Sequence, residues 1–269
     1  MASIIGHLLA VAVGLSLGLI GGGGSILAVP ILVYVMGVTP KEAIAISLAS
    51  VGTVSAIGAI FHGLEKRVRG DIALIFAPTA MLGAFIGAYG ASFPWVSDTL
   101  QLVCFTVIMI LASILMIRKG HRQQQRLEAM PIPKRGSGTV TNASVWKNIL
   151  IPLEGLGIGI LTGFVGIGGG FAIVPALVLL TSIPMKQAIG TSLLIIAFKS
   201  ITGFLGYVGQ VEMNWALIST FTLAASVGTV MGTYLGRFIN AKVLQASFGY
   251  FILCFAVVML FYQFSPFSS

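Results

Sequence analysis

The sequence predicts an all-α polytopic membrane protein, built as two inverted repeats of about five helical segments each, 8–10 membrane segments in total, with broken helices at glycine-rich motifs. Three observations predict it. Of 269 residues, 57% are hydrophobic and 8% charged, and the mean hydropathy is +1.04, whereas soluble domains carry about 25% charged residues. One glycine-rich stretch occurs twice. Basic residues gather in loops whose positions place the two halves in opposite orientations.

The duplicated stretch is GGGGSILAVP at 21–30 and GIGGGFAIVP at 166–175. The offset of 145 residues holds without a gap from Gly14 and Gly159 to Gly87 and Gly232. Between Gly14 and Gly58, 16 of 45 positions are identical to their counterparts. The chain is therefore an internal duplication, and the glycine runs are its most similar part.

In the first half, the apolar segments 4–20 and 25–37 flank the first glycine run. One continuous helix of about 34 residues would measure about 51 Å, against a hydrocarbon core of about 30 Å. We therefore expect the glycines to divide two shorter helices that fold back on each other. No basic region or cleavage site marks the start as a signal peptide, so the first apolar segment is expected to remain in the fold.

The other elements follow from apolar runs between capping or loop residues. Thr39, Pro40 and Glu42 form a helix start, with Thr39 as the predicted N-cap. This helix is expected to end near 61, and the remaining predicted helices are 71–91, 99–117, 148–165, 170–182, 185–207, 213–235 and 241–263. The predicted organisation is membrane repeat 1 at 1–118, a basic linker at 119–147, and inverted membrane repeat 2 at 148–269.

Loop charges set the expected orientation, because short loops rich in Lys and Arg stay cytoplasmic. Loop 63–70 contains Lys66, Arg67 and Arg69, whereas its counterpart 208–214 has no basic residue. Counterpart loops on opposite sides require inverted halves. We expect a multi-pass protein of the bacterial inner membrane with loops 63–70 and 236–242 and linker 119–147 in the cytoplasm, and with loops 91–98 and 208–214 and both termini outside.

The glycine runs are the first candidate binding elements. A helix that starts inside a membrane has unpaired N–H groups and partial positive charge at its first turn, and glycines let an anion approach them. The candidates for substrate binding are Gly23, Gly24, Ser25, Gly168, Gly169 and Gly170. The alternative is that the glycines serve only close helix crossing. Neither copy continues with the Gly-Lys-Ser/Thr of a nucleotide-binding loop.

Polar side chains on the helices after the breaks are the second set of candidates. Ser47, Thr191 and Ser192 could donate to an anion, or could bond only to their own helix. Lys199 lies deep in an apolar span and could neutralise an anion, or could extend to the interface. Glu154 could be its partner or a proton carrier, or a carboxylate at the membrane interface. Three residues at helix ends are first interpreted as interface residues, with a gating or substrate role as the alternative: His62, Tyr207 and Arg237.

The sequence contains no catalytic constellation, because the three histidines are scattered. We expect no enzyme activity, no cofactor, no metal site and no nucleic-acid partner. Cys104 and Cys254 are expected to be core residues. The expected partners are a small anionic substrate, with a proton as the candidate coupled ion, and the lipid bilayer. A homodimer through small-residue stripes is left open, with Gly83, Gly87, Gly228 and Gly232 as its residues.

The motifs 21–30 and 166–175, together with Gly190-Thr191-Ser192-Leu193, resemble the TauE/SafE family of sulfite exporters over both halves. The first half departs at Ala45-Ile46-Ser47, which puts a symmetric hydroxyl site in doubt. The resemblance implies secondary transport, in the export direction, of sulfite, sulfonates such as sulfoacetate, or related sulfur anions. A passive channel, or a carrier of another small anion such as carboxylate or thiosulfate, is the alternative. A cation substrate would require carboxylates within the membrane as ligands, and Glu154 is the one candidate.

Overall fold

The computed structural model describes residues 2–91, 143–165, 170–179, 181, 183–207 and 213–240, and some residues within 106–118 and 243–257. Every regular element in these residues is a helix. The predicted all-α class is therefore confirmed. The residues described within 106–118 and 243–257 are also helical, as expected for the predicted helices 99–117 and 241–263.

The two halves contain four matching α-helices in the same order, and the first half also has a π-helical segment. The first has α1 (Ala2–Ile20), α2 (Gly24–Pro30), the π-helical segment η1 (Ile31–Val35), α3 (Pro40–Leu64) and α4 (Gly70–Ala91). The second has α6 (Ala143–Val165), α7 (Gly170–Leu179), α8 (Met185–Tyr207) and α9 (Trp215–Phe238). Helix α6 begins five residues before the predicted 148, and the rest of the linker 119–147 lies outside the described residues.

The first glycine run reverses the chain, as predicted. Gly21 adopts a φ of +90°, which glycine reaches without strain. Gly24 then packs against Val13 and Leu17 of α1, and Met36 returns as far as Gly6. Helices α1 and α2–η1 therefore form a hairpin inside the apolar region.

Two details concern the helix around Pro30 and the start of α3. Pro30 lacks an N–H, and the helix widens to π geometry directly after it, over Ile31–Val35. Thr39 is the N-cap residue of α3, as predicted, but its side chain makes no capping hydrogen bond. Its carbonyl accepts from the Ala43 N–H at 2.8 Å instead, and Pro40 occupies the first helical turn, where no N–H donor is needed.

Helices α3 and α8 pack against each other at the centre and show that the halves are inverted. A Cβ on Gly58 would lie 3.0 Å from Leu193 Cδ1, and a Cβ on Gly203 would lie 3.1 Å from Leu48 Cδ2. Adding 145 to the residue number in the first half and subtracting 145 from that in the second half converts one contact into the other. Because the contact positions run in opposite order along the helices, α3 and α8 are antiparallel. A pseudo-two-fold axis therefore relates the repeats.

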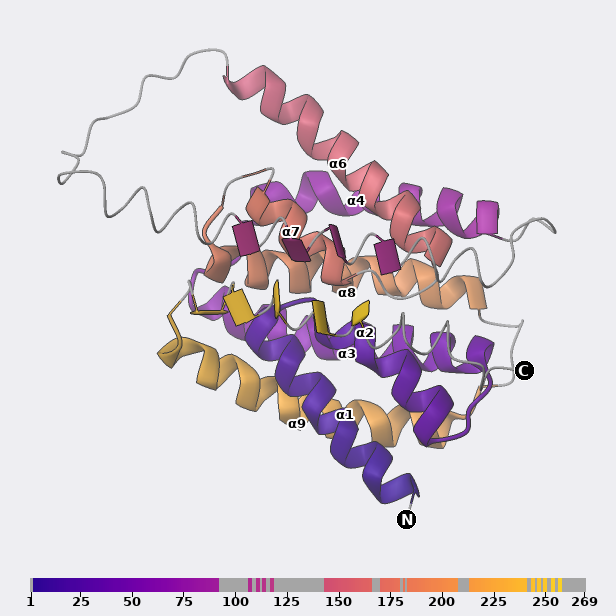
Figure 1. Cartoon of the computed structure of the whole chain (residues 1–269). Coiled ribbons are helices and arrows are strands. Elements are labelled where there is room, and N and C mark those ends of the chain that lie inside the picture. Colours follow the sequence, from indigo (N-terminus) through magenta and orange to yellow (C-terminus); the bar gives the residue numbers. More distant parts are fainter. Residues whose placement is uncertain are drawn as a thin grey trace.

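The repeats are also interlocked. The first helix of each repeat packs on the fourth helix of the other, α1 on α9 and α6 on α4, at the bottom and the top of Figure 1. Glycines on these helices face carbonyl groups so closely that a Cβ would overlap them, as in membrane helix pairs generally. The matching contacts are Gly14 with Ala225 and Gly159 with Ala80, and Gly228 with Val11 and Gly83 with Leu156.

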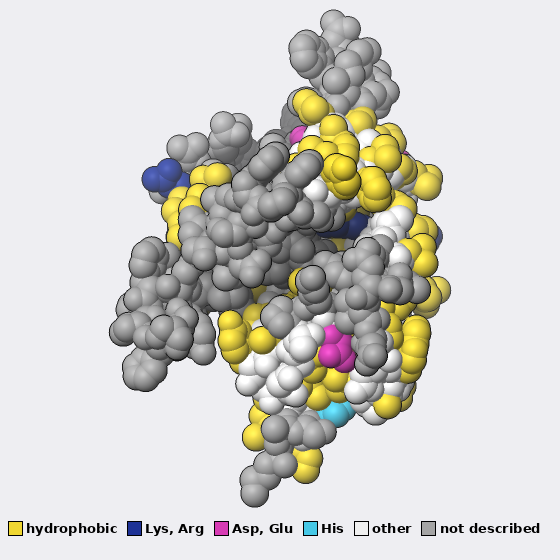
Figure 2. Space-filling model, turned by 90° about the vertical axis from the view of Figure 1, so that its right-hand side faces the viewer, with side chains coloured by type: hydrophobic (Ala, Val, Ile, Leu, Met, Phe, Trp, Pro, Cys, Tyr) yellow, Lys and Arg dark blue, Asp and Glu magenta, His cyan; other side chains and the backbone are white. Residues whose placement is uncertain are grey.

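The described exterior is strongly apolar. Large side chains such as Leu74, Phe85, Leu205 and Leu223 are more than three-fifths exposed, and Figure 2 shows hydrophobic side chains over much of the described surface on one face. Four of the described helices are long and apolar enough to cross a membrane, at 42–64, 70–87, 185–205 and 215–238. This exterior is what a lipid environment requires.

The interlocked packing gives a stability prediction. Gly228→Ala should lower the unfolding temperature in detergent, because its Cβ overlaps the Val11 carbonyl of α1 and over-packing costs about 1–3 kcal/mol. Gly157→Ala is the matched control, since it lies within α6 with nothing near the new Cβ. Equal unfolding temperatures for the two variants would contradict the α1–α9 contact.

Candidate functional site

The two glycine breaks meet in space. A Cβ on Gly170, the first residue of α7, would lie 3.0 Å from Ser25 Oγ and 3.1 Å from the Gly22 carbonyl oxygen. Gly170 and Ser25 are counterparts under the 145-residue offset. Two counterparts can touch only where the pseudo-two-fold axis passes between them. The starts of α2 and α7 therefore lie at the centre of the molecule, side by side.

The first break also packs on the helix that follows the second break. A Cβ on Gly21 would lie 2.7 Å from Ser192 Oγ and 2.9 Å from Ile189 Cα, both in α8. The positive φ of Gly21 brings its backbone to this close approach. The first break therefore packs directly against helix α8.

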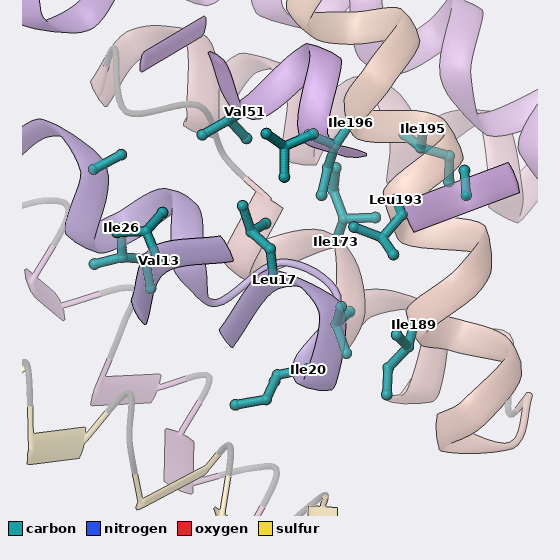
Figure 3. Close-up of a cluster of buried hydrophobic side chains, with 14 of the residues drawn as sticks. Val13, Leu17, Ile20, Ile26, Val51, Ile173, Ile189, Leu193, Ile195 and Ile196 are labelled. Atoms are coloured by element: carbon teal, nitrogen blue, oxygen red, sulfur yellow. The ribbon is translucent and has the colours of Figure 1, made fainter. Parts of the chain in front are cut away.

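One face of α8 carries the residues that line this region. Ser192, Ile196 and Lys199 are spaced i, i+4 and i+7, which places them on one face of a helix. Ile196 Cδ1 would lie 2.7 Å from a Cβ on Gly170. Figure 3 shows Ile196 and Leu193 of α8 in one apolar cluster with Leu17 of α1 and Ile173 of α7. The candidate site is therefore enclosed by apolar side chains.

Lys199 is 6% exposed, so it does not extend to the interface. Its Nζ donates to Thr162 Oγ1, and Thr162 lies in the last turn of α6, just before the second break. Among the described residues, no ion pair joins Lys199 to Glu154, so Glu154 is not its partner in this structure. Glu154 has a buried Oε2 without a described hydrogen-bond partner.

The candidate hydroxyls divide into bonded and free groups. Ser25 Oγ donates to the Gly22 carbonyl at 2.8 Å and Ser192 Oγ to the Ile189 carbonyl at 2.8 Å. Thr191 Oγ1 accepts from the Arg69 N–H at 2.9 Å, so it ties α8 to the loop after α3. Ser47, 2% exposed, has no hydrogen-bond partner for its Oγ among the described residues.

The remaining candidates differ in placement. Gly23 immediately precedes α2, and Gly24 contacts α1 rather than the second break. Gly168 and Gly169 lie outside the described residues. Gly170 is the second-repeat glycine that the structure places at the meeting point.

Sequence reasoning missed Thr162, and it interpreted His62 first as an interface residue. Thr162 is the partner of Lys199, and its signal was a hydroxyl in an apolar helix four residues before Gly166. His62 was assigned to a helix end but is buried. Its ring lies beside the Gly18 carbonyl of α1, although neither ring nitrogen forms a hydrogen bond with a described partner.

Comparison with known proteins agrees with this architecture. A family model described as "Sulfite exporter TauE/SafE" matches residues 7–263. The chain belongs to the TauE/SafE family. A protein of Xylella fastidiosa named "Probable membrane transporter protein" is 34% identical over 252 residues, covering 92% of this chain and 91% of that protein.

A second relative is the "Probable membrane transporter protein YunE" of Bacillus subtilis. It is 32% identical over 242 residues, which cover 83% of each chain. No solved structure matches the chain. The resemblance drawn from the glycine motifs is thus confirmed, and the chain is a multi-pass membrane protein of a transporter family.

The break geometry gives a second prediction. Gly21→Ala and Gly37→Ala both place an alanine at positive φ, +90° and +71°, which costs about 1–2 kcal/mol at each site. Only the Cβ at 21 also meets Ser192 and Ile189, since nothing lies within 4 Å at 37. We expect thermal unfolding to fall further for Gly21→Ala. A Gly37→Ala variant that is destabilised as much would show that the contact with α8 is unimportant.

Proposed function

We propose that this protein is a secondary transporter that exports a small sulfur-containing anion, such as sulfite or a sulfonate, by alternating access between its two repeats. Membrane transport is the function that the family and the named relatives indicate. The observation that carries the rest is the meeting of Gly170 with Ser25 and Gly22 beside a buried lysine. The proposed substrate site lies there, between the two breaks.

The breaks suit an oxyanion for a physical reason. The first amides of α7 and of the continuous helical segment α2–η1 have no partner within their own helix, although the Ile26 N–H donates to the Gly23 carbonyl at 3.4 Å. The helix dipoles add partial positive charge at the same ends. Glycine at 170 leaves the backbone uncovered by a side chain. Two such ends side by side can together accept a group that carries several oxygens.

Lys199 supports a negatively charged substrate. An ammonium group removed from water is costly unless it is paired, and its bonded neighbour here is the neutral Thr162 hydroxyl. An anion at the adjacent break would supply the missing charge. Among the described residues, no cluster of three His, Cys, Asp or Glu could hold a metal ion. This favours an anion over a metal cation as the substrate.

Interlocked inverted repeats also support alternating access. In such transporters the substrate stays near the repeat interface while one part of the fold rocks against the other. The antiparallel pair α3–α8 lies at the pseudo-two-fold axis, with α1–α9 on one side and α4–α6 on the other (Figure 1). The two outer pairs could move in turn while the central pair holds the site.

The direct test uses purified protein. Thermal unfolding is followed with sulfite, thiosulfate, sulfonates and carboxylates, and transport of the best stabilising anion is then measured in proteoliposomes with an imposed gradient. Accumulation against the anion's own gradient supports the carrier. Flux that only dissipates that gradient indicates the passive channel, and stabilisation by none of the sulfur anions would contradict the proposed substrate class.

Lys199→Met tests the counter-charge. The affinity for the anion should fall about tenfold or more, as for hydrogen bonds to charged groups, while the unfolding temperature of the free protein is unchanged or raised because an unpaired buried charge is removed. Lys186→Met is the control, since it removes the same charge from the exposed end of the same helix. Unchanged affinity in Lys199→Met would exclude the lysine from the site.

Ser47→Ala tests the free hydroxyl. Because Ser47 Oγ has no described partner, its loss should cost the empty protein little, and the anion's affinity should fall about threefold to tenfold, the value of one hydrogen bond. Ser192→Ala breaks an existing bond to Ile189 and should mainly lower stability. The measurement is anion titration and unfolding of both variants. The opposite pattern would assign the substrate contact to Ser192.

A further inference from the structure

A group of charged residues joins the two repeats at the end of the molecule where the loop after α3 lies. Glu65, in the first repeat, pairs with Arg237 at the end of α9, in the second. It also pairs with Arg67, whose Nη1 lies 2.6 Å from Glu65 Oε2. Lys186 Nζ donates to the Arg237 carbonyl at 3.2 Å. The Glu65 side chain is 16% exposed, so water screens these contacts only partly.

The same loop closes over α8 beside the first break. The Arg69 N–H donates to Thr191 Oγ1 at 2.9 Å. A Cβ on Gly190 would lie 2.8 Å from the Arg67 carbonyl oxygen. The next residue after Thr191 is Ser192, which faces Gly21. Loop 65–69 therefore contacts α8 within one helical turn of the proposed substrate site.

The counterpart positions in the sequence lack the residues for an equivalent group. Under the 145-residue offset, the counterpart of Glu65 is the neutral Gln210 and the counterpart of Arg237 is Ser92. The counterpart of Arg67 is Glu212, of opposite charge. The same ion pairs therefore cannot form at the counterpart positions, although the packing of the scaffold is otherwise two-fold.

We propose that Glu65, Arg67 and Arg237 form a latch between the repeats, which holds the transport pathway closed at the loop 65–69 end and biases the protein toward the state open at the other end. In an inverted-repeat transporter the two end states exchange the conformations of the repeats. Contacts present at one end only stabilise one of those states, and an equilibrium shifts by the free energy specific to one state. The inference rests on the proposed alternating access.

The test measures opening at this end without any substrate. Ala188, buried in α8 one turn before Ser192, is changed to Cys in protein whose Cys104 and Cys254 are changed to Ala. Labelling by a membrane-impermeant maleimide is timed in right-side-out and inside-out vesicles. Glu65→Gln should speed labelling from the loop 65–69 side about threefold to tenfold, the range for breaking a partly screened ion pair.

Two further variants separate the latch from general loosening. The double variant Glu65→Arg with Arg237→Glu restores an ion pair between positions 65 and 237 with the charges exchanged, and should bring labelling back toward the starting rate. Asp71→Asn breaks the exposed pair Arg69–Asp71 within the first repeat at the same end and should leave the rate unchanged.

The outcomes discriminate between the ideas. Unchanged labelling in Glu65→Gln, faster labelling only from the opposite side, or equal acceleration by Asp71→Asn would overturn the latch. If none of the sulfur anions raises the unfolding temperature of the unlabelled protein, the proposed substrate is overturned instead. A latch confirmed by the labelling rates would stand even if the transported anion proved to be a different one.

Discussion

The contact between Gly170 and Ser25 is the constraint on which the rest of the structure depends. These two positions are counterparts, so they meet on the pseudo-two-fold axis and cannot both carry a side chain that fills the same space. One repeat supplies the serine, and the other supplies the glycine that accommodates it. The close approach fixes both hairpins, which place the helix starts together, and it lets α8 pack on Gly21. A backbone buried this deeply in an apolar region must be covered by protein, and the interlocked helices cover it.

Much of the fold could be predicted because the sequence contains the same repeat twice. Periodic apolar runs, the 145-residue offset and the loop charges specified the helices, the hairpin at Gly21 and the inversion. Pairing between helices could not be predicted, because glycine stripes show that a helix has a close neighbour without showing which one. That Gly228 faces α1 rather than its own repeat follows only from the three-dimensional arrangement.

The candidate site was predicted in part. Gly170, Ser25, Ser192 and Lys199 do lie around the breaks, but the sequence could not tell that the Ser25 and Ser192 hydroxyls are already bonded to carbonyls. Thr191 lies one residue before Ser192 on α8, so its side chain is on a different face of the helix and contacts loop 65–69. Lys199 and Thr162 are 37 residues apart in the sequence and lie on different helices, so no local pattern predicts their pairing.

The interlocked repeats have a consequence for how the chain is made. Helix α1 leaves the ribosome well before its partner α9, which is made more than 190 residues later, since α1 ends at Ile20 and α9 begins at Trp215. Gly14 and Gly18 must face lipid or the insertion machinery until then. Neither half can bury these surfaces alone, since α1 packs on α9 and α4 packs on α6 and α8 of the other half. A gene split at the linker would yield halves that need each other during biogenesis, not only during transport.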